Sequence, residues 1–240
     1  MKVAILADIH ANIEALEAVL LAADKAGAQR FVVLGDIVGY GPDPVACIYR
    51  LQEVGAIGLL GNHDQALVEP ECLVALNHEA RQTLLLSRDL LGPAQLSYLA
   101  SLAFRHVEWG GVFTHANPIA PEGWEHLYLH EQVAWCLRRM DWQVGFVGHT
   151  HIAAIYCKIG DQIVSLTSAQ VAVGRHQFLI NPGSVGQPRD RDSRASFALW
   201  DLDLEHVELR RVEYPVRKTQ AKMAQAGWPC YATERLALGE

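Results

Sequence analysis

Residues 3–20 read VAILADIHANIEALEAVL, and this stretch decides the fold. Its first five residues form an apolar run of strand length, and Asn12 can cap a following helix. The apolar side chains of that helix recur at helical spacing, at Ile13, Leu16, Val19 and Leu20. The stretch therefore predicts a strand, a short polar loop and a helix.

A second unit of the same kind follows directly. An apolar strand at residues 31–34 precedes a loop rich in Gly and Pro, a helix to about residue 54, and a strand at residues 56–60. Strands that alternate with helices favour parallel crossovers, so we expect an α/β sheet. Residues 65–102 are mostly helical by their apolar period, and we expect them to form a helical cap or insert.

Strands return in the second half of the chain, with hairpin-like spacing. They are expected at residues 104–109, 112–114, 144–147, 153–159, 162–166, 178–180, 196–202 and 206–212. Helices are expected at residues 130–140 and 216–226, and a short tail follows. A length of 240 residues fits one domain, or two small ones at most, and we expect a single domain over residues 1–240.

The composition argues against several classes of function. The 27 acidic and 20 basic residues give a net charge of -7, which opposes non-specific binding to nucleic acid or to an anionic membrane. No apolar run reaches the roughly 18 residues that span a bilayer, and the N-terminus lacks a cleavage-site pattern. The five scattered cysteines suit a reducing compartment. We expect a cytoplasmic protein and leave a homo-oligomer open.

Five short polar segments follow apolar runs, and together they suggest one chemistry. Residues two apart in an extended chain share a face, so a carboxylate and an imidazole spaced by two can reach one metal ion. The carboxyl ends of neighbouring strands also meet in one crevice of an α/β sheet. The segments supply Asp8, His10, Asp36, Asn62, His63, Asp64, His115, His149 and His151.

This set suits two divalent metal ions. Mixed nitrogen and oxygen ligands favour Mn, Fe, Zn, Ni or Co over Ca or Mg, and Mn is our first choice. Two dications about 4 Å apart repel each other, so a shared carboxylate and a shared hydroxide are needed between them. Asp36 stands alone in its segment before a glycine-rich loop, and we predict that it is the bridge.

Such a centre can hydrolyse a phosphate ester. Two dications, less the charges of Asp8, Asp36 and a hydroxide, leave about +1, which attracts a phosphate anion. The cations also lower the pKa of trapped water toward neutrality, which makes it a nucleophile. His63 is expected to donate a proton to the leaving alkoxide, and Asp64 is available to orient and charge His63.

Simpler interpretations exist for each part. Asn12 is most simply a helix cap, and Trp124 and Tyr128 either pack in the core or line a substrate pocket. Five polar clusters at strand ends are harder to explain independently, which favours a metal site. Six histidines without Gly or Asp neighbours are interpreted as surface or packing residues: His78, His106, His126, His130, His176 and His206.

The order of the polar segments resembles the calcineurin-like metallophosphoesterase superfamily, whose blocks run D-x-H, G-D, G-N-H-D/E, H and G-H-x-H. More narrowly, GDIVGYGPDP at residues 35–44 and NPGSVGQPR at residues 181–189 are similar to the small bacterial and archaeal branch related to YfcE-type phosphodiesterases. The resemblance implies a two-sheet β-sandwich flanked by helices on both sides, a four-layer α/β/β/α fold.

The resemblance also implies roles for individual residues. One metal ion would be held by Asp8, His10 and His151, and the other by Asn62, His115 and His149. Asp36 would be shared, and His63 would be the acid near the leaving group. Ala11 and Ala116 stand where glycine is frequent in the family, which implies adjusted loops with the ligands retained.

Departures from the protein Ser/Thr phosphatases bear on the substrate. Val38 and Gly39 stand where those enzymes have an Asp-Arg pair, so an arginine that grips a phosphomonoester is missing there. This favours phosphodiesters of a small molecule or a nucleotide. Arg189 either contacts the phosphate or stabilises the fold at the surface, and Asn12 is a second candidate substrate contact.

Other functions of the same centre remain open. They are a phosphomonoesterase or phosphoprotein phosphatase, a nucleotide pyrophosphatase, and a catalytically silent binding scaffold. Scaffold members of the superfamily usually lose ligands, and this chain has lost none. The leaving-group preference is expected to depend on pocket walls at residues 65–102 and 117–130.

Overall fold

The first strand, β1 (Lys2–Leu6), lies inside a six-stranded sheet of the computed structural model, which describes all residues, 1–240. Two crossover helices, α1 (Ile13–Lys25) and α2 (Pro44–Glu53), make the first three strands parallel. The other side of β1 pairs with an antiparallel strand. The sheet order is β3 (Ile57–Gly58), β2 (Arg30–Val33), β1, β11 (Ala195–Asp201), β12 (His206–Val212) and β9 (Gln170–Ala172).

A second six-stranded sheet is formed by the middle of the chain. Its order is β4 (Arg105–Glu108), β5 (Gly111–Thr114), β6 (Val144–Phe146), β10 (Gln177–Asn181), β7 (Ala154–Ile159) and β8 (Gln162–Leu166). The strands β5, β6 and β10 are parallel, whereas β4, β7 and β8 are joined as antiparallel partners. The hairpins that the second half of the sequence predicts are therefore confirmed.

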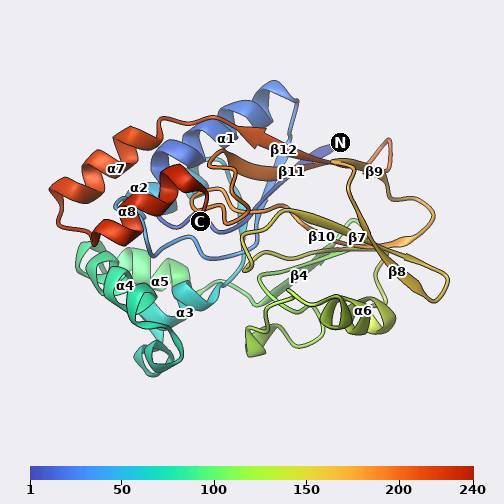
Figure 1. The fold of residues 1–240 in the computed structure, drawn as a ribbon, viewed down its shortest axis with the longest axis horizontal. Coiled ribbons are helices and arrows are strands. Elements are labelled where there is room, and N and C mark those ends of the chain that lie inside the picture. Colours follow the sequence, from blue (N-terminus) through green and yellow to red (C-terminus); the bar gives the residue numbers. More distant parts are fainter.

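The alternation of side chains along β1 explains the layers. Val3 and Ile5 point into a core between the two sheets, whereas Ala4 and Leu6 point into a core under α1 and α2. The second sheet is covered on its outer face by α6 (His130–Arg139), through a third core. The two sheets lie face to face with helices outside them (Figure 1). The predicted four-layer sandwich is confirmed.

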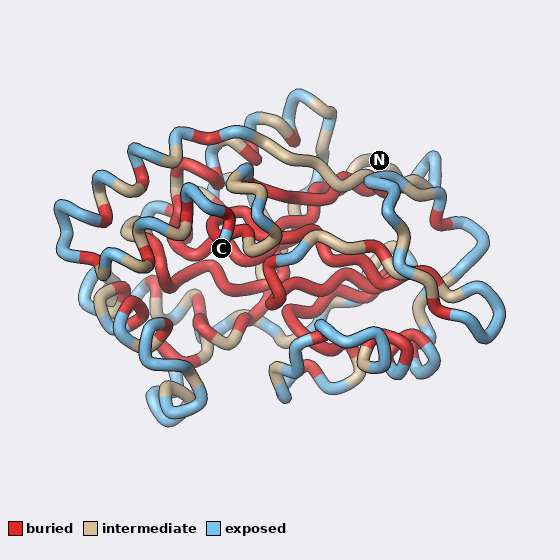
Figure 2. The backbone as a smooth tube through the Cα atoms, viewed as in Figure 1, coloured by how far each residue is buried: buried red, intermediate tan, exposed pale blue.

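Aromatic rings fill the space between the sheets. Phe113 stacks on Phe146 with centroids 5.3 Å apart, and Trp200 from the first sheet packs on Phe146 at 5.3 Å. The buried backbone runs through the middle of both sheets, and the exposed residues lie on the outer helices and loops (Figure 2). This packing fixes the ends of the strands of one sheet against those of the other.

Residues 62–100 are helical, as the apolar period predicts. They form α3 (Asn62–Val68), a 3-10 turn η1 (Pro70–Ala75), α4 (His78–Leu90) and α5 (Pro93–Ala100). Leu84 and Leu99 are buried against the core under α1 and α2, so the segment packs on the first sheet's side of the molecule. Figure 1 shows it at one end of the sandwich, away from the hairpin of β7 and β8.

Two elements differ from the sequence prediction. After α7 (Val216–Gln225), the expected short tail is instead a helix, α8 (Cys230–Leu238), because Ala232 and Leu236 bury against Met223 and Trp228. The three-residue strand β9 was also not expected, since its pairing with β12 depends on a neighbour far along the chain. No helix combines the length and the apolar character that crossing a membrane requires. A cytoplasmic location stays a prediction.

Candidate metal centre

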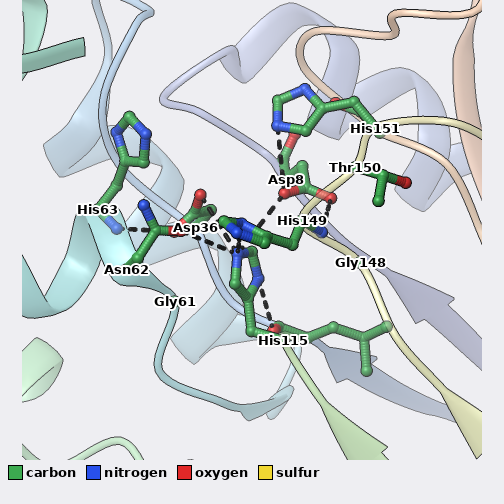
Figure 3. Close-up of polar contacts among 12 residues, drawn as sticks. Asp8, Asp36, Gly61, Asn62, His63, His115, Gly148, His149, Thr150 and His151 are labelled. Atoms are coloured by element: carbon green, nitrogen blue, oxygen red, sulfur yellow. Dashed lines mark hydrogen bonds and ion pairs between the residues drawn. The ribbon is translucent and has the colours of Figure 1, made fainter. Parts of the chain in front are cut away.

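The predicted ligands lie just beyond the carboxyl ends of five strands. Asp8 and His10 follow β1, Asp36 follows β2, and Asn62 follows β3 in the first sheet. In the second sheet, His115 follows β5, while His149 and His151 follow β6. Since these strands are parallel within each sheet, their ends meet at one edge of the sandwich. Figure 3 shows Asp8, Asp36, His115 and His149 directed toward one another from separate loops.

The loops that carry the ligands adopt an uncommon backbone conformation. Positive φ angles occur at Asp8 (54°), His10 (48°), Asp36 (51°), His149 (67°) and His151 (61°). This left-handed region costs about 1 to 2 kcal/mol for each residue that is not glycine. The cost is tolerated because the loops bind each other through backbone hydrogen bonds, of 3.1 Å from Asp8 to Gly35 and 3.0 Å from His10 to Asp36.

Glycines allow the loops to approach closely. A Cβ atom on Gly61 would lie 2.1 Å from the Asp36 Oδ1 atom, and one on Gly186 would lie 1.9 Å from the Ile9 carbonyl oxygen. No real side chain fits at either distance, so glycine is required at both positions. The glycine of the G-N-H-D segment therefore lets the third strand end directly against the Asp36 carboxylate.

One group of ligand atoms gathers around Asp8. The Nε2 atom of His151 lies 3.3 Å from Asp8 Oδ1 and 3.1 Å from Nε2 of His10. The Asp36 Oδ2 atom lies 3.6 Å from His10 Nε2. All four side chains are buried, and their ligand atoms lie within 4.8 Å of one another. This is the spacing of atoms that surround one ion.

A second group shares Asp36 with the first. The Nε2 atom of His115 lies 3.4 Å from Asp36 Oδ2 and 3.0 Å from Nδ1 of His149. The side-chain oxygen of Asn62 lies 3.2 Å from the same His115 nitrogen. Asp36 is thus the carboxylate common to both groups. The structure brings together all seven residues that the sequence predicts as ligands.

Backbone carbonyls orient all four imidazoles. His10 Nδ1 lies 3.0 Å from the Val38 oxygen, and His115 Nδ1 lies 3.1 Å from the Leu34 oxygen. His151 Nδ1 lies 2.6 Å from the Gln187 carbonyl oxygen, and His149 Nε2 lies 3.0 Å from the Trp124 carbonyl oxygen. A carbonyl only accepts, so each outer nitrogen carries the proton, and in the neutral ring the inner nitrogen presents a lone pair.

With all four rings neutral and both carboxylates ionised, these inner lone pairs would face each other and the two carboxylates without a donor among them. The Asp8 Oδ1 atom is buried and has no hydrogen-bond partner. An unsatisfied buried acceptor costs about 1 to 3 kcal/mol. Divalent cations would satisfy all of these acceptors at once, and an outer N–H bonded to a carbonyl is the usual support of a metal-binding histidine. The donor set therefore fits divalent metal ions.

The electrostatics of the metal-free side chains point the same way. Burial, with repulsion from Asp36, raises the pKa of Asp8 to about 7. Although burial opposes its charge, attraction to Asp36 and Asp8 raises the pKa of His115 to about 9. Burial lowers the pKa of His10, His149 and His151 well below the usual value. Protons on Asp8 and His115 therefore occupy places that cations would take.

His63 lies beside the ligand groups and belongs to neither. Its backbone N–H donates to Asp36 Oδ1 at 2.9 Å, and its ring lies 4.8 Å from the Tyr40 ring. The Nδ1 atom is buried without a partner, and a Cβ atom on Gly39 would lie only 2.5 Å from it. Burial lowers the pKa of His63. The ring is thus held at the edge of the centre with an unused nitrogen (Figure 3).

Asp64 has a different place from the one expected. Its carboxylate accepts from the backbone N–H groups of Ile37 at 3.0 Å, Val38 at 3.2 Å and Gly61 at 3.1 Å. It makes no hydrogen bond to the His63 ring, because neighbouring residues of α3 point in different directions. The expected role of orienting and charging His63 is therefore corrected: Asp64 ties the loop after β2 to the start of α3.

The side chain of Asn12 also makes its hydrogen bonds within the fold. Its amide nitrogen donates to the Gly186 carbonyl at 2.9 Å and to the Tyr214 hydroxyl at 3.2 Å. Its oxygen accepts from the Ala15 N–H at 3.2 Å and from the Thr219 hydroxyl at 3.1 Å. With both ends of the amide satisfied, Asn12 caps α1, and the expectation of a substrate contact is corrected.

A cavity of about 640 Å³ opens from the metal centre. Its inner surface includes Asp36, His63 and Arg189, and its walls come from residues 65–80 and 122–126, within the two segments expected to form pocket walls. The Arg189 guanidinium donates to Gln187 Oε1 at 2.8 Å and lies 5.6 Å from the centre of the Tyr40 ring. Arg189 therefore lines the cavity beside the candidate metal ligands.

Two residues that line the cavity are not predicted as site residues from the sequence. His126, interpreted as a surface or packing residue, lines the cavity and stacks on the His149 ring with centroids 3.7 Å apart. Tyr40 lines it beside His63. The signal for His126 is its nearness in sequence to Trp124, which also lines the cavity and so fits the pocket interpretation.

Known proteins resemble this chain over its whole length. Residues 1–205 match the model of the calcineurin-like phosphoesterase superfamily domain. An uncharacterised protein of Methanocaldococcus jannaschii is 34% identical over an alignment of 241 positions that covers 99% of this chain and 98% of that protein. A metallophosphoesterase structure from Sphaerobacter thermophilus has 34% identity and a TM-score of 0.87, covering 100% of this chain and 99% of that one.

The YfcE phosphoesterase of E. coli is also similar, at 23% identity and a TM-score of 0.48, over 89% of this chain and 100% of that one. The match to the superfamily model and the two relatives at 34% identity confirm the resemblance that the order of the polar segments indicates.

Metal binding at about pH 7 should release protons. With a pKa of about 7, Asp8 is about half protonated, and with a pKa of about 9, His115 is protonated; both must deprotonate to bind a cation. We expect about one to two protons released per chain and tighter binding as the pH rises. Titration calorimetry with Mn²⁺ in buffers of different ionisation enthalpy measures the number. A release near zero would contradict this protonation pattern.

Proposed function

The chain belongs to the calcineurin-like phosphoesterase superfamily, and from this premise we propose that it is a phosphodiesterase acting on a small molecule or nucleotide at a dinuclear metal centre. Membership supports a phosphoric ester hydrolase. The proposal of a dinuclear centre rests on one observation: the carboxylate of Asp36 belongs to both groups of buried ligand atoms. A shared carboxylate is what two neighbouring dications need to offset their repulsion.

The proposed ligands divide between the two ions. Asp8, His10 and His151 would hold one, Asn62, His115 and His149 the other, with Asp36 between them. The imidazole-rich set suits divalent transition metals, Mn first, with Fe, Zn, Ni or Co as alternatives. When bound, the ions would activate water as a nucleophile and offset the charge of the phosphate.

Two further side chains complete the proposed mechanism. The Arg189 guanidinium, fixed by Gln187, would bind a non-bridging phosphate oxygen. His63 would donate a proton to the leaving oxygen. Burial lowers the pKa of His63 in the free protein, and a bound phosphate anion favours the protonated ring. Substrate binding and protonation of His63 would therefore support each other.

The preference for a diester rests on charge. Arg189 is the only Lys or Arg side chain that lines the cavity, and the loop after Asp36 carries Val38 and Gly39 where a phosphate-gripping arginine is found in the protein phosphatases. A diester carries one negative charge and a monoester up to two. A single guanidinium beside the metal ions suits the smaller charge.

A matched pair of substrates tests this preference. With Mn²⁺ present, kcat/KM for bis(p-nitrophenyl) phosphate should exceed that for p-nitrophenyl phosphate by about tenfold or more, because the monoester's second charge has no partner. Release of p-nitrophenol measures both rates, with chelator-treated protein as the control. Equal or faster monoester turnover would favour a phosphomonoesterase, and silence with both metals bound would favour a scaffold.

The role of His63 is tested by the leaving group. His63→Ala should slow hydrolysis of esters with alkyl leaving groups by about 100-fold or more, with a smaller effect on nitrophenyl esters, which leave without a proton. Metal content, measured by elemental analysis, should stay the same. His130→Ala, at an exposed position on α6, is the matched control. An unchanged alkyl rate would remove His63 from the mechanism.

The sharing of Asp36 is tested by metal content. Asp36→Asn should reduce occupancy at both positions, because the amide loses the charge that offsets two dications. Elemental analysis after dialysis against Mn²⁺ should give well under one ion per chain. Asp24→Asn, an exposed residue of α1, should bind as the unaltered protein does. Loss of one ion only would show that Asp36 serves a single metal.

A further inference from the structure

The cavity is larger than a phosphate group requires. Its volume of about 640 Å³ lies within the range of about 300 to 1,000 Å³ typical of pockets that enclose a whole ligand. The phosphate would occupy only the end at Asp36 and Arg189. The chemistry of the remaining walls therefore determines what group the phosphate carries.

The two walls of the outer cavity differ in kind. One wall is apolar and comes from η1 and α4, through Val74, Ala75, Leu76 and Ala80. The other is aromatic and comes from the irregular segment before α6, through Trp124 and His126. Trp124 Nε1 donates to the side-chain oxygen of Gln65 at 2.8 Å, which ties the aromatic wall to α3. An apolar surface facing aromatic rings suits a flat, uncharged group.

The aromatic wall is rigidly built. Trp124 has a φ angle of 49°, which is rare for a bulky residue and persists only where contacts enforce it. Leu127 anchors the segment in the core under α6, whereas Trp124 and His126 line the cavity. The Trp124 carbonyl accepts from His149, and the His126 ring stacks on the same His149. The wall thus has a fixed position relative to the metal centre.

The charges at the mouth limit the choice of ligand. Glu71 and Glu122 line the cavity, are exposed, and form no ion pair. Arg189 is the only Lys or Arg side chain in the lining and lies at the metal end. A second phosphate or an acidic peptide at the outer end would meet negative charge without a cation. An uncharged ring meets no such penalty.

We infer that the outer cavity is a nucleobase subsite, with the base held between the Trp124 and His126 wall and the apolar wall from Val74 to Ala80. The substrate is accordingly a nucleoside phosphate ester with its phosphate at the metal centre. Stacking on aromatic side chains suits bases because each has a flat π face. The inference rests on the proposed function for the phosphate end of the same site.

Binding of two ligands that differ only in the base tests the inference. Adenosine 5′-monophosphate and ribose 5-phosphate have the same sugar and phosphate, so a difference in affinity reports the base alone. On the Mn²⁺-loaded protein, calorimetry should give a Kd about tenfold or more lower for the nucleotide. Equal affinities, or no binding of either ligand, would overturn the inference.

Substitutions locate the effect. Trp124→Leu should reduce the affinity ratio of nucleotide to ribose phosphate by about tenfold, whereas Trp135→Leu, on α6 outside the cavity, should preserve it. Elemental analysis shows whether the metal content of each variant is normal. If Trp124→Leu does not fold, His126→Leu replaces it in the same measurement, because His126 is exposed and its substitution should not prevent folding. A ratio unchanged in a folded variant would overturn the placement of the base.

Failure of this inference is distinguishable from failure of the proposed function. Diester hydrolysis with equal affinities for the two ligands would leave the function intact and remove the base subsite. Tighter binding of the nucleotide without turnover of any ester would support the subsite and remove the hydrolase.

Discussion

Four backbone carbonyls turn four buried imidazoles toward one another, and the rest of the site depends on this constraint. Each carbonyl holds the proton of a histidine on its outer nitrogen, so in the neutral rings the inner nitrogens meet two carboxylates as acceptors without donors. Such an arrangement is unfavourable in a protein core unless positive charge lies between the acceptors. The strained loops, the close glycines and the pairing of two sheets all maintain it.

The sequence predicts which side chains gather at the site because their positions depend on short-range features. An apolar run ends, the chain turns, and Asp8, Asp36 or His149 follows at the first polar position. Parallel pairing then brings these positions to one edge whatever the details of the core. The hairpins of the second half are predictable for the same reason, since each is formed by neighbouring segments.

Side-chain direction and long-range partners are less accessible. Asp64 follows His63 in sequence, yet their side chains leave α3 in different directions, and only the loop at Ile37 shows which groups the carboxylate meets. His126 has no Gly or Asp neighbour, so its place in the cavity depends on a stack with a residue more than twenty positions away. The helix α8 depends on packing against Met223 and Trp228, and the apolar period of its own sequence does not reveal that packing.

The amide of Asn12 joins both ends of the chain. It caps the helix that follows the first metal loop, and its partners include Tyr214 and Thr219. Those two residues lie beyond residue 205, where the match to the superfamily domain ends. The C-terminal segment is consequently a brace for the metal centre: removing it would leave two of the four hydrogen bonds of the buried Asn12 amide unmade, directly behind the loop that carries His10.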